Sequence, residues 1–150
     1  MCYSSGNQFI AQIPTWILIV SGWYAVHYFA KERDKCKEAR ERLDQLILTL
    51  RAIEEKAIQF HQSTSYKGDI ARTLVFDIQR IIAKLKRHPL GSFNISPNLQ
   101  KELRQSITLK NFDASQFSYQ PDNSLILSKV ANAVDDIEDQ LEKEYERIYL

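Results

Sequence analysis

The chain opens with a long stretch of residues that carry no charge. From Phe9 to Ala30 the sequence reads FIAQIPTWILIVSGWYAVHYFA, and none of these 22 residues is Lys, Arg, Asp or Glu. As a helix rising ~1.5 Å per residue the stretch would be about 33 Å long, enough to cross a hydrocarbon core of ~30 Å. The pattern predicts one transmembrane helix over residues 9–30. Its marker residues are Phe9, Trp16, Ile17, Leu18, Ile19, Val20, Trp23, Tyr24 and Tyr28.

The stretch has two other interpretations, a cleaved signal peptide and a buried core helix. A cleavable signal peptide needs a basic start and small residues before the cut, whereas residues 1–8 (MCYSSGNQ) are uncharged and the stretch ends in HYFA. A buried core helix is the second alternative, although 22 uncharged residues exceed what a domain of this size needs. The transmembrane helix is therefore the favoured interpretation.

The charges that follow the stretch predict its orientation. Residues 31–42 hold six basic and four acidic side chains, and residues 1–8 hold none. Because basic flanks are retained in the cytoplasm, residues 1–8 are expected outside the cell membrane and residues 31–150 in the cytoplasm. The basic residues of this flank are Lys31, Arg33, Lys35, Lys37, Arg40 and Arg42.

Beyond the flank, apolar residues recur at steps of three and four. This spacing is the a/d pattern of a helical seam, as in coiled coils and helical bundles. The seam is expected to make contacts either inside the chain's own bundle or with a second copy. It runs through Cys36, Ala39, Leu43, Leu46, Leu50, Ile53, Ala57 and Phe60, and we take Leu43, Leu46, Leu50, Ile53 and Phe60 as its defining residues.

Three further helices are predicted after a turn at residues 62–68. The first has Asp69 as its N-cap and ends before Pro89, and the second opens at Ser96-Pro97 and is short. The last runs from about Asn123 to the end, after an irregular connection that Phe112, Phe117 and Tyr119 are expected to hold against the bundle. The fold predicted is all-α: one transmembrane helix, then a cytosolic antiparallel bundle of three long helices and one short one.

Charge is sorted along this predicted bundle, although the chain as a whole has a net charge of only +1. Residues 31–110 hold 17 basic and 10 acidic side chains, and residues 111–150 hold 3 basic and 9 acidic. One interpretation is that the acidic last helix packs beside the basic first two. The other is that the basic helix nearest the membrane contacts anionic lipid headgroups, which leaves the acidic face for a cytosolic partner.

No catalytic residue, metal site or cofactor is predicted. His27, His61 and His88 form no metal-ligand spacing, and the four glycines form no phosphate loop. Arg80 and His88 are similar to the Arg–His pair of the all-α HEPN ribonucleases, but seven residues separate them where that family has four to six. Nucleic acid is not an expected partner, because no aromatic platform accompanies the small basic cluster at 84–87.

The first third of the chain resembles the small single-span proteins of bacterial inner membranes whose functions are unknown. The residues that carry the resemblance are Trp23-Tyr24 through Tyr28, followed by Lys31-Glu32-Arg33-Asp34-Lys35. Some proteins of that plan look like components of defence or mobile-element cassettes. The sequence thus predicts a membrane-anchored, non-enzymatic protein that binds the bilayer and either an unknown protein partner or further copies of itself.

The alternative is a membrane-perturbing effector of a defence or toxin type, which would oligomerise through its span. Its assembly face would be lined by Gln12, Thr15, Ser21 and His27, because polar side chains within a span favour association of helices.

Overall fold

The computed structural model describes the backbone of residues 6–87, 89–109 and 111–149, with side chains from Trp16 onward. These residues form four α-helices and no strand, so the all-α prediction is confirmed. The helices are α1 (Gly6–His61), α2 (Gly68–Leu85), α3 (Pro97–Thr108) and α4 (Leu125–Tyr149), with a 3-10 turn, η1 (Leu90–Ser92), between α2 and α3. Contacts divide the chain into an N-terminal unit, up to Glu38, and a bundle unit from Ala39.

The helix starts follow from local side-chain chemistry, with one correction. Ser96 caps α3 as predicted, because its hydroxyl accepts the Asn98 N–H at 3.2 Å. The prediction of Asp69 as the N-cap of α2 is wrong, because the helix already begins at Gly68. Asp69 lies in the first turn, where the helix dipole stabilises a carboxylate. Ser124 performs the capping role at α4, since its hydroxyl accepts the Leu127 N–H at 3.3 Å.

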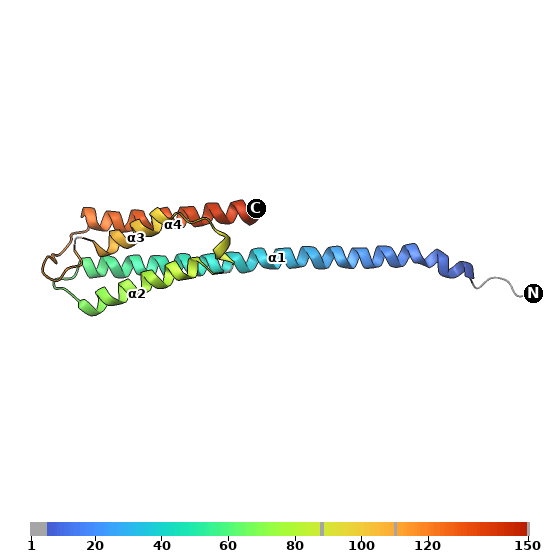
Figure 1. Ribbon diagram of the computed structural model, residues 1–150, viewed down its shortest axis with the longest axis horizontal. Coiled ribbons are helices and arrows are strands. Elements are labelled where there is room, and N and C mark those ends of the chain that lie inside the picture. The colour runs from blue at the N-terminus through green and yellow to red at the C-terminus, as the bar shows by residue number, and fades with distance from the viewer. Residues whose placement is uncertain (1–5, 88, 110, 150) are drawn as a thin grey trace, which may run out of the picture. The chain divides into compact units, whose positions relative to one another are not determined.

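The bundle unit is an antiparallel four-helix arrangement. In Figure 1, α2 (green), α3 (orange), α4 (red) and the teal part of α1 run alongside one another in alternating directions. Packing contacts join α3 to both α2 and α4, and ion pairs join α1 to both α2 and α4. Since α1 and α3 each contact both other helices, α2 and α4 occupy opposite corners of the bundle. This matches the prediction of three long helices and one short one.

The core lies between these helices at the predicted apolar positions. On α2 and α4 the inward residues recur every three to four positions, which is the spacing that places side chains on one face of a helix. Ile70, Ile82, Leu99, Tyr145 and Ile148 pack at its margin. The buried residues on those two helices are Ala71, Leu74, Ile78, Ile81, Leu85, Leu127, Val130, Ala133, Val134, Ile137 and Leu141.

The connection between α3 and α4 is held down by aromatic packing. The ring of Phe60 lies 5.2 Å from that of Phe112 and 5.3 Å from that of Phe117, centroid to centroid. These two residues therefore hold the connection as predicted. The prediction is wrong for Tyr119, whose side chain is more than half exposed. The connection is held beside it by the Gln120 N–H, which donates to the His61 carbonyl at 2.9 Å.

Within the part of the chain whose side chains the structure describes, no helix has a run of residues that is both long and apolar enough to cross a membrane. Residues 9–15 of the predicted span, Phe9 included, lie outside that part. The predicted transmembrane helix is thus not confirmed.

Candidate membrane segment and binding faces

The predicted span carries large apolar side chains that no other part of the described chain covers. From Trp16 to Phe29, every large apolar or aromatic side chain is between 53% and 71% exposed. The residues are Trp16, Ile17, Leu18, Ile19, Val20, Trp23, Tyr24, Val26, Tyr28 and Phe29. Because they point in all directions around the helix, this is not the single apolar stripe of a helix packed on a core.

The polar groups of this segment have local partners. The hydroxyl of Ser21 donates to the carbonyl of Leu18 at 3.1 Å, and the ring of His27 stacks on that of Trp23 at 5.5 Å. A Cβ added at Gly22 would meet no atom within 4 Å. The Ser21 hydroxyl, which is expected to line an assembly face, thus has its hydrogen-bond partner within its own helix. Gln12 and Thr15, the other polar candidates on that face, lie outside the described side chains.

The basic flank has two parts. Lys31, Arg33, Lys35 and Lys37 are exposed, and Lys35 forms an ion pair with Glu32 at 2.6 Å. The hydrogen bond from Lys35 to Glu32 raises the pKa of the lysine. Arg42 is exposed and lines a groove between α1 and α2.

Arg40, the remaining flank residue, belongs to the bundle. Its guanidinium lies 2.7 Å from Glu142 of α4 and 2.9 Å from Asp44, and it sits 5.5 Å above the ring of Tyr145. The hydrogen bond to Glu142 raises the pKa of Arg40 above its ordinary value. This side chain joins two helices and is committed to packing, so it adds little to a membrane-facing charge.

The helix seam is buried inside the chain's own bundle. Leu43, Leu50 and Phe60 are fully buried, and Leu46 and Ile53 are each 2% exposed. Of the two roles that the sequence left open for the seam, the structure shows the internal one. The seam is therefore not available for contact with a partner protein or a second copy.

Charges on α1 and α4 neutralise one another across their interface. Arg51 forms ion pairs with Asp135 at 2.8 Å and with Glu138 at 2.6 Å, and Arg40 pairs with Glu142. Such partly exposed pairs contribute little stability each, but opposite charges fix which helices lie together. The packing interpretation of the charge sorting thus holds for α1 and α4.

The cations of α2 are different, because α4 does not reach them. Arg72, Arg80 and Lys84 are exposed, and Arg80 comes only to 3.8 Å of its nearest carboxylate, Asp77. Asp77 is held by Lys56 of α1 at 2.6 Å. Phe76 lies between the two arginines and is 57% exposed. We name Arg72, Phe76, Arg80 and Lys84 the α2 ridge, since they recur every four residues along one side of the helix.

The outward side of α4 is acidic. Asp136, Asp139 and Glu146 are exposed there, together with Lys143. Asp135 points toward α1 and pairs with Arg51. We name Asp136, Asp139 and Glu146 the α4 acidic face. On the described chain no ion pair involves these three carboxylates.

A groove of about 390 Å³ runs between α3 and α4. Leu109 and Ile126 supply apolar surface, while Glu102, Lys129 and Asp136 supply charges of both signs. This mixed lining does not select one ligand chemistry.

The most buried polar group of the bundle is an imidazole. His61 is fully buried, its Nε2 lies 3.2 Å from the carbonyl oxygen of Ile107, and its Nδ1 lies 3.2 Å from Nδ2 of Asn111. Because a carbonyl accepts and an amide nitrogen donates, the neutral tautomer with hydrogen on Nε2 satisfies both contacts. Burial away from water lowers the pKa of His61.

Asn111 is fixed in turn by the backbone of Ser118. Its Nδ2 donates to the Ser118 carbonyl at 2.9 Å, and its Oδ1 accepts the Ser118 N–H at 2.8 Å. The imidazole is thus a structural link to the α3–α4 connection. His88, which forms the HEPN-like pair with Arg80 in the sequence, lies outside the described residues. Among the described residues, no group of His, Cys, Asp and Glu is arranged to hold a metal ion.

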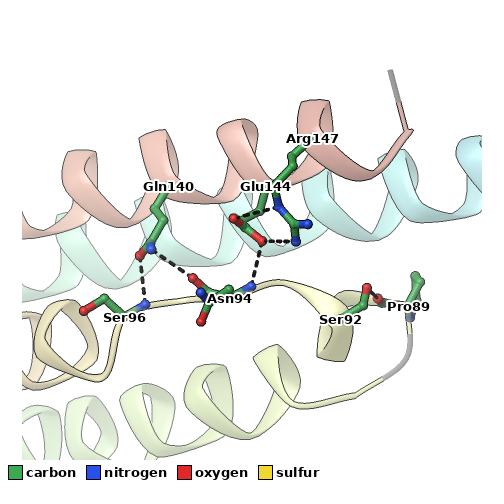
Figure 2. Close-up of polar contacts among 7 residues, drawn as sticks. All are labelled: Pro89, Ser92, Asn94, Ser96, Gln140, Glu144 and Arg147. Carbon is green, nitrogen blue, oxygen red and sulfur yellow. Dashed lines mark hydrogen bonds and ion pairs between the residues drawn. The ribbon is translucent and has the colours of Figure 1, made fainter.

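A second polar link joins α4 to the chain ahead of α3, as Figure 2 shows. Gln140 accepts the Ser96 N–H at 3.0 Å and donates to the Asn94 carbonyl at 3.0 Å. Glu144 accepts the Asn94 N–H at 2.8 Å and pairs with Arg147. The Arg147 hydrogen bond, and then that of Asn94, lower the pKa of the Glu144 carboxyl.

Comparisons with family models, with curated proteins and with solved structures gave no match to this chain.

Proposed function

We propose that this chain is a single-span membrane protein whose helical bundle acts by binding other protein, either a partner or further copies of itself. The observation that carries the proposal is the all-round exposure of the large apolar side chains from Trp16 to Phe29. Such a surface is unfavourable in water, because removing apolar area from water gains roughly 25 cal/mol per Å². A bilayer would cover it completely.

The sequence around this segment supports the same proposal. Residues 1–30 contain no Lys, Arg, Asp or Glu, and Phe9, Ile10 and Ile13 extend the apolar run ahead of Trp16. Tyr28 and Phe29 come just before the first charge, where aromatic rings favour the boundary between lipid and water. The proposed orientation places the exposed basic residues Lys31, Arg33, Lys35 and Lys37, and the bundle after them, in the cytoplasm.

A binding role for the bundle follows from how its surfaces are used. The seam is buried in the core, and the imidazole of His61 is buried in a structural link to the α3–α4 connection. The α2 ridge and the α4 acidic face remain exposed and carry opposite charge. We propose that the bundle functions by binding protein through these outer faces, and not through a catalytic centre.

The membrane part of the proposal is tested by alkaline carbonate extraction of membranes that contain the full chain. We expect the wild-type chain to stay in the pellet, and the Leu18→Lys/Val20→Lys variant to move to the supernatant, because each charge at the centre of a span costs ~3 kcal/mol. Leu48→Lys is the matched control, since Leu48 is equally exposed but lies in the bundle. Wild-type chain in the supernatant would refute the anchor.

Orientation is tested separately by adding protease to sealed membrane vesicles of known sidedness. When the cytoplasmic face is outside, we expect residues 31–150 to be digested. When that face is inside, we expect them to be protected. The reverse pattern would contradict the orientation without touching the anchor.

A further inference from the structure

We propose that the bundle self-associates side by side through two different faces, with the α2 ridge of one copy against the α4 acidic face of the next. The proposal rests on the proposed function, because a shared membrane brings the bundles of neighbouring copies together on the same side of the bilayer. It goes further by naming the partner, a second copy of this chain, and the two faces that meet.

The directions in which α2 and α4 face decide how two copies can meet. Because α1 and α3 each contact both α2 and α4, these two helices occupy opposite corners of the bundle, and in Figure 1 α4 lies above and α2 below. Their outward sides therefore face away from each other. A copy placed beside another in the same orientation brings one α2 next to one α4, which is a heterologous interface that can repeat or close into a ring.

Ion pairs to α1 show which residues of α2 and α4 lie at the same height along the bundle. Lys56 of α1 pairs with Asp77 of α2, and Arg51, five residues earlier on α1, pairs with Asp135 and Glu138 of α4. Since α2 runs antiparallel to α1, the position level with Arg51 on α2 is about residue 82. Residue 82 of α2 is thus level with residues 135–138 of α4.

At that height α2 carries cations and α4 carries carboxylates. Arg80 and Lys84 lie on either side of residue 82, and Asp136 and Asp139 lie at the corresponding height on α4. All four side chains are exposed. A neighbouring copy would therefore present two carboxylates directly opposite two cations, which gives both attraction and register.

Two of the charges of the wrong sign, Asp69 and Lys143, fall outside this overlap, whereas Lys129, which lines the same groove as Asp136, lies within it. By the same counting, Asp69 on the outward side of α2 is level with residues that precede the start of α4 at Leu125. Lys143 on the outward side of α4 is level with residues beyond the end of α2 at Leu85. The exposed apolar side chains Phe76 and Leu125 both lie on the N-terminal side of the matched charges, and so at one end of the interface.

The test uses two differently tagged full-length copies, co-expressed, solubilised in a neutral detergent and captured through one tag. We expect wild-type copies to co-purify at low salt and to separate at about 1 M salt, where the Debye length falls to ~3 Å. We expect co-purification to fall at least about tenfold when both copies carry Arg80→Glu/Lys84→Glu, and equally when both carry Asp136→Lys/Asp139→Lys.

The decisive arm mixes the two variants. A copy with the reversed α2 ridge and a copy with the reversed α4 acidic face are complementary at both contacts, so co-purification should return to the wild-type level. Lys67→Glu/Lys101→Glu, which reverses two exposed cations elsewhere, should leave it unchanged. Restoration also shows that both variants fold.

Three results would overturn the inference: wild-type copies that do not co-purify, single reversals that have no effect, or a mixture that fails to recover. If reversal of the ridge acts alone and the mixture stays apart, the ridge serves an anionic lipid surface or a nucleic acid instead. Carbonate extraction of the same membranes reports on the anchor independently, so failure of self-association and failure of the anchor are distinguished.

Discussion

At the scale of single residues, His61 links the end of α1 to the connection that leads into α4. It contacts the Ile107 carbonyl on one side and Asn111 on the other, and Asn111 is fixed by the backbone of Ser118. A proton on Nδ1 would point at the Nδ2 hydrogens of Asn111, whose amide cannot turn without losing both bonds to Ser118. The link therefore requires a neutral imidazole.

This requirement makes the bundle sensitive to acid. The pKa of His61 is lowered in the folded chain by burial, so the unfolded chain binds more protons once the pH falls below about 6.5. We expect full stability above that pH and a loss of up to about 1.4 kcal/mol per pH unit below it. Chemical denaturation between pH 5 and 8 measures this slope.

The control for this prediction is His27→Gln, which removes an exposed imidazole from the N-terminal unit and should keep the slope. His61→Gln should lower stability at pH 8 and flatten the slope between pH 5 and 6.5. A slope that persists in His61→Gln would show that another group senses the acid.

Gly91 is the second residue whose identity is set by its surroundings. A Cβ at this position would lie 2.9 Å from the backbone oxygen of Lys86 and 3.2 Å from its carbonyl carbon. Backbone atoms cannot give way as the end of a side chain can, so Gly91→Ala should cost about 1–3 kcal/mol, measured by thermal or chemical unfolding.

Gly68→Ala is the matched change. Its Cβ would meet only the Tyr66 ring at 3.5 Å, an ordinary contact, and Ala favours a helix more than Gly does. We expect it to be neutral or slightly stabilising. Equal losses in the two variants would contradict the close approach at Gly91.

At the scale of elements, the two faces of α1 in the bundle should differ sharply in what they tolerate. Leu50 is fully buried and Leu48 is 70% exposed, although they are two residues apart. Leu50→Asp buries a carboxylate without a partner and should unfold the bundle, and Leu46→Asp should do the same. Leu48→Asp should change stability by less than about 0.5 kcal/mol.

Circular dichroism of the full chain separates these variants, because loss of the bundle removes most of the helical signal of residues 39–150. Helicity and cooperative melting that survive Leu50→Asp would mean that the seam does not hold the bundle together.

The sequence alone predicts those elements whose cause is local. The three-four spacing from Leu43 to Phe60 placed the seam correctly, and Ser96-Pro97 placed the start of α3. Where two local signals competed, the prediction failed: Asp69 is a good cap, but it is equally favourable in the first turn, where the structure has it. Ser124 could have been found as a cap by the same reasoning that found Ser96.

The features that the sequence could not predict depend on residues far apart in the chain. The His61–Asn111 contact joins positions separated by 50 residues, and Gln140 reaches Asn94 across 46. Asn111 appeared in the sequence only as a residue typical of loops. Likewise, the charge sorting was visible, but which cations α4 would neutralise, Arg40 and Arg51, follows only from the packing.

At the scale of the whole molecule, the two units present opposite surfaces to their surroundings. The bundle unit buries its apolar residues and exposes charge, whereas the N-terminal unit exposes its apolar residues from Trp16 to Phe29. We attribute this difference to two solvents, lipid for one unit and water for the other. We propose that the uncharged segment lies in a bilayer.

The two tryptophans of the chain, Trp16 and Trp23, make this claim directly measurable, because both lie in the segment and none lies in the bundle. Each is three to four residues from the middle of residues 9–30, which places it about 5 Å from the bilayer centre at ~1.5 Å per residue. Trp16→Phe and Trp23→Phe variants report on the two indoles one at a time.

The decisive measurement is tryptophan fluorescence of the full chain reconstituted in vesicles whose lipids carry bromine deep in the acyl chains. We expect short-wavelength emission, strong quenching by the brominated lipids and little quenching by aqueous acrylamide, in both single-tryptophan variants. Emission typical of indole in water, quenched by acrylamide and indifferent to bromine, would contradict this proposal.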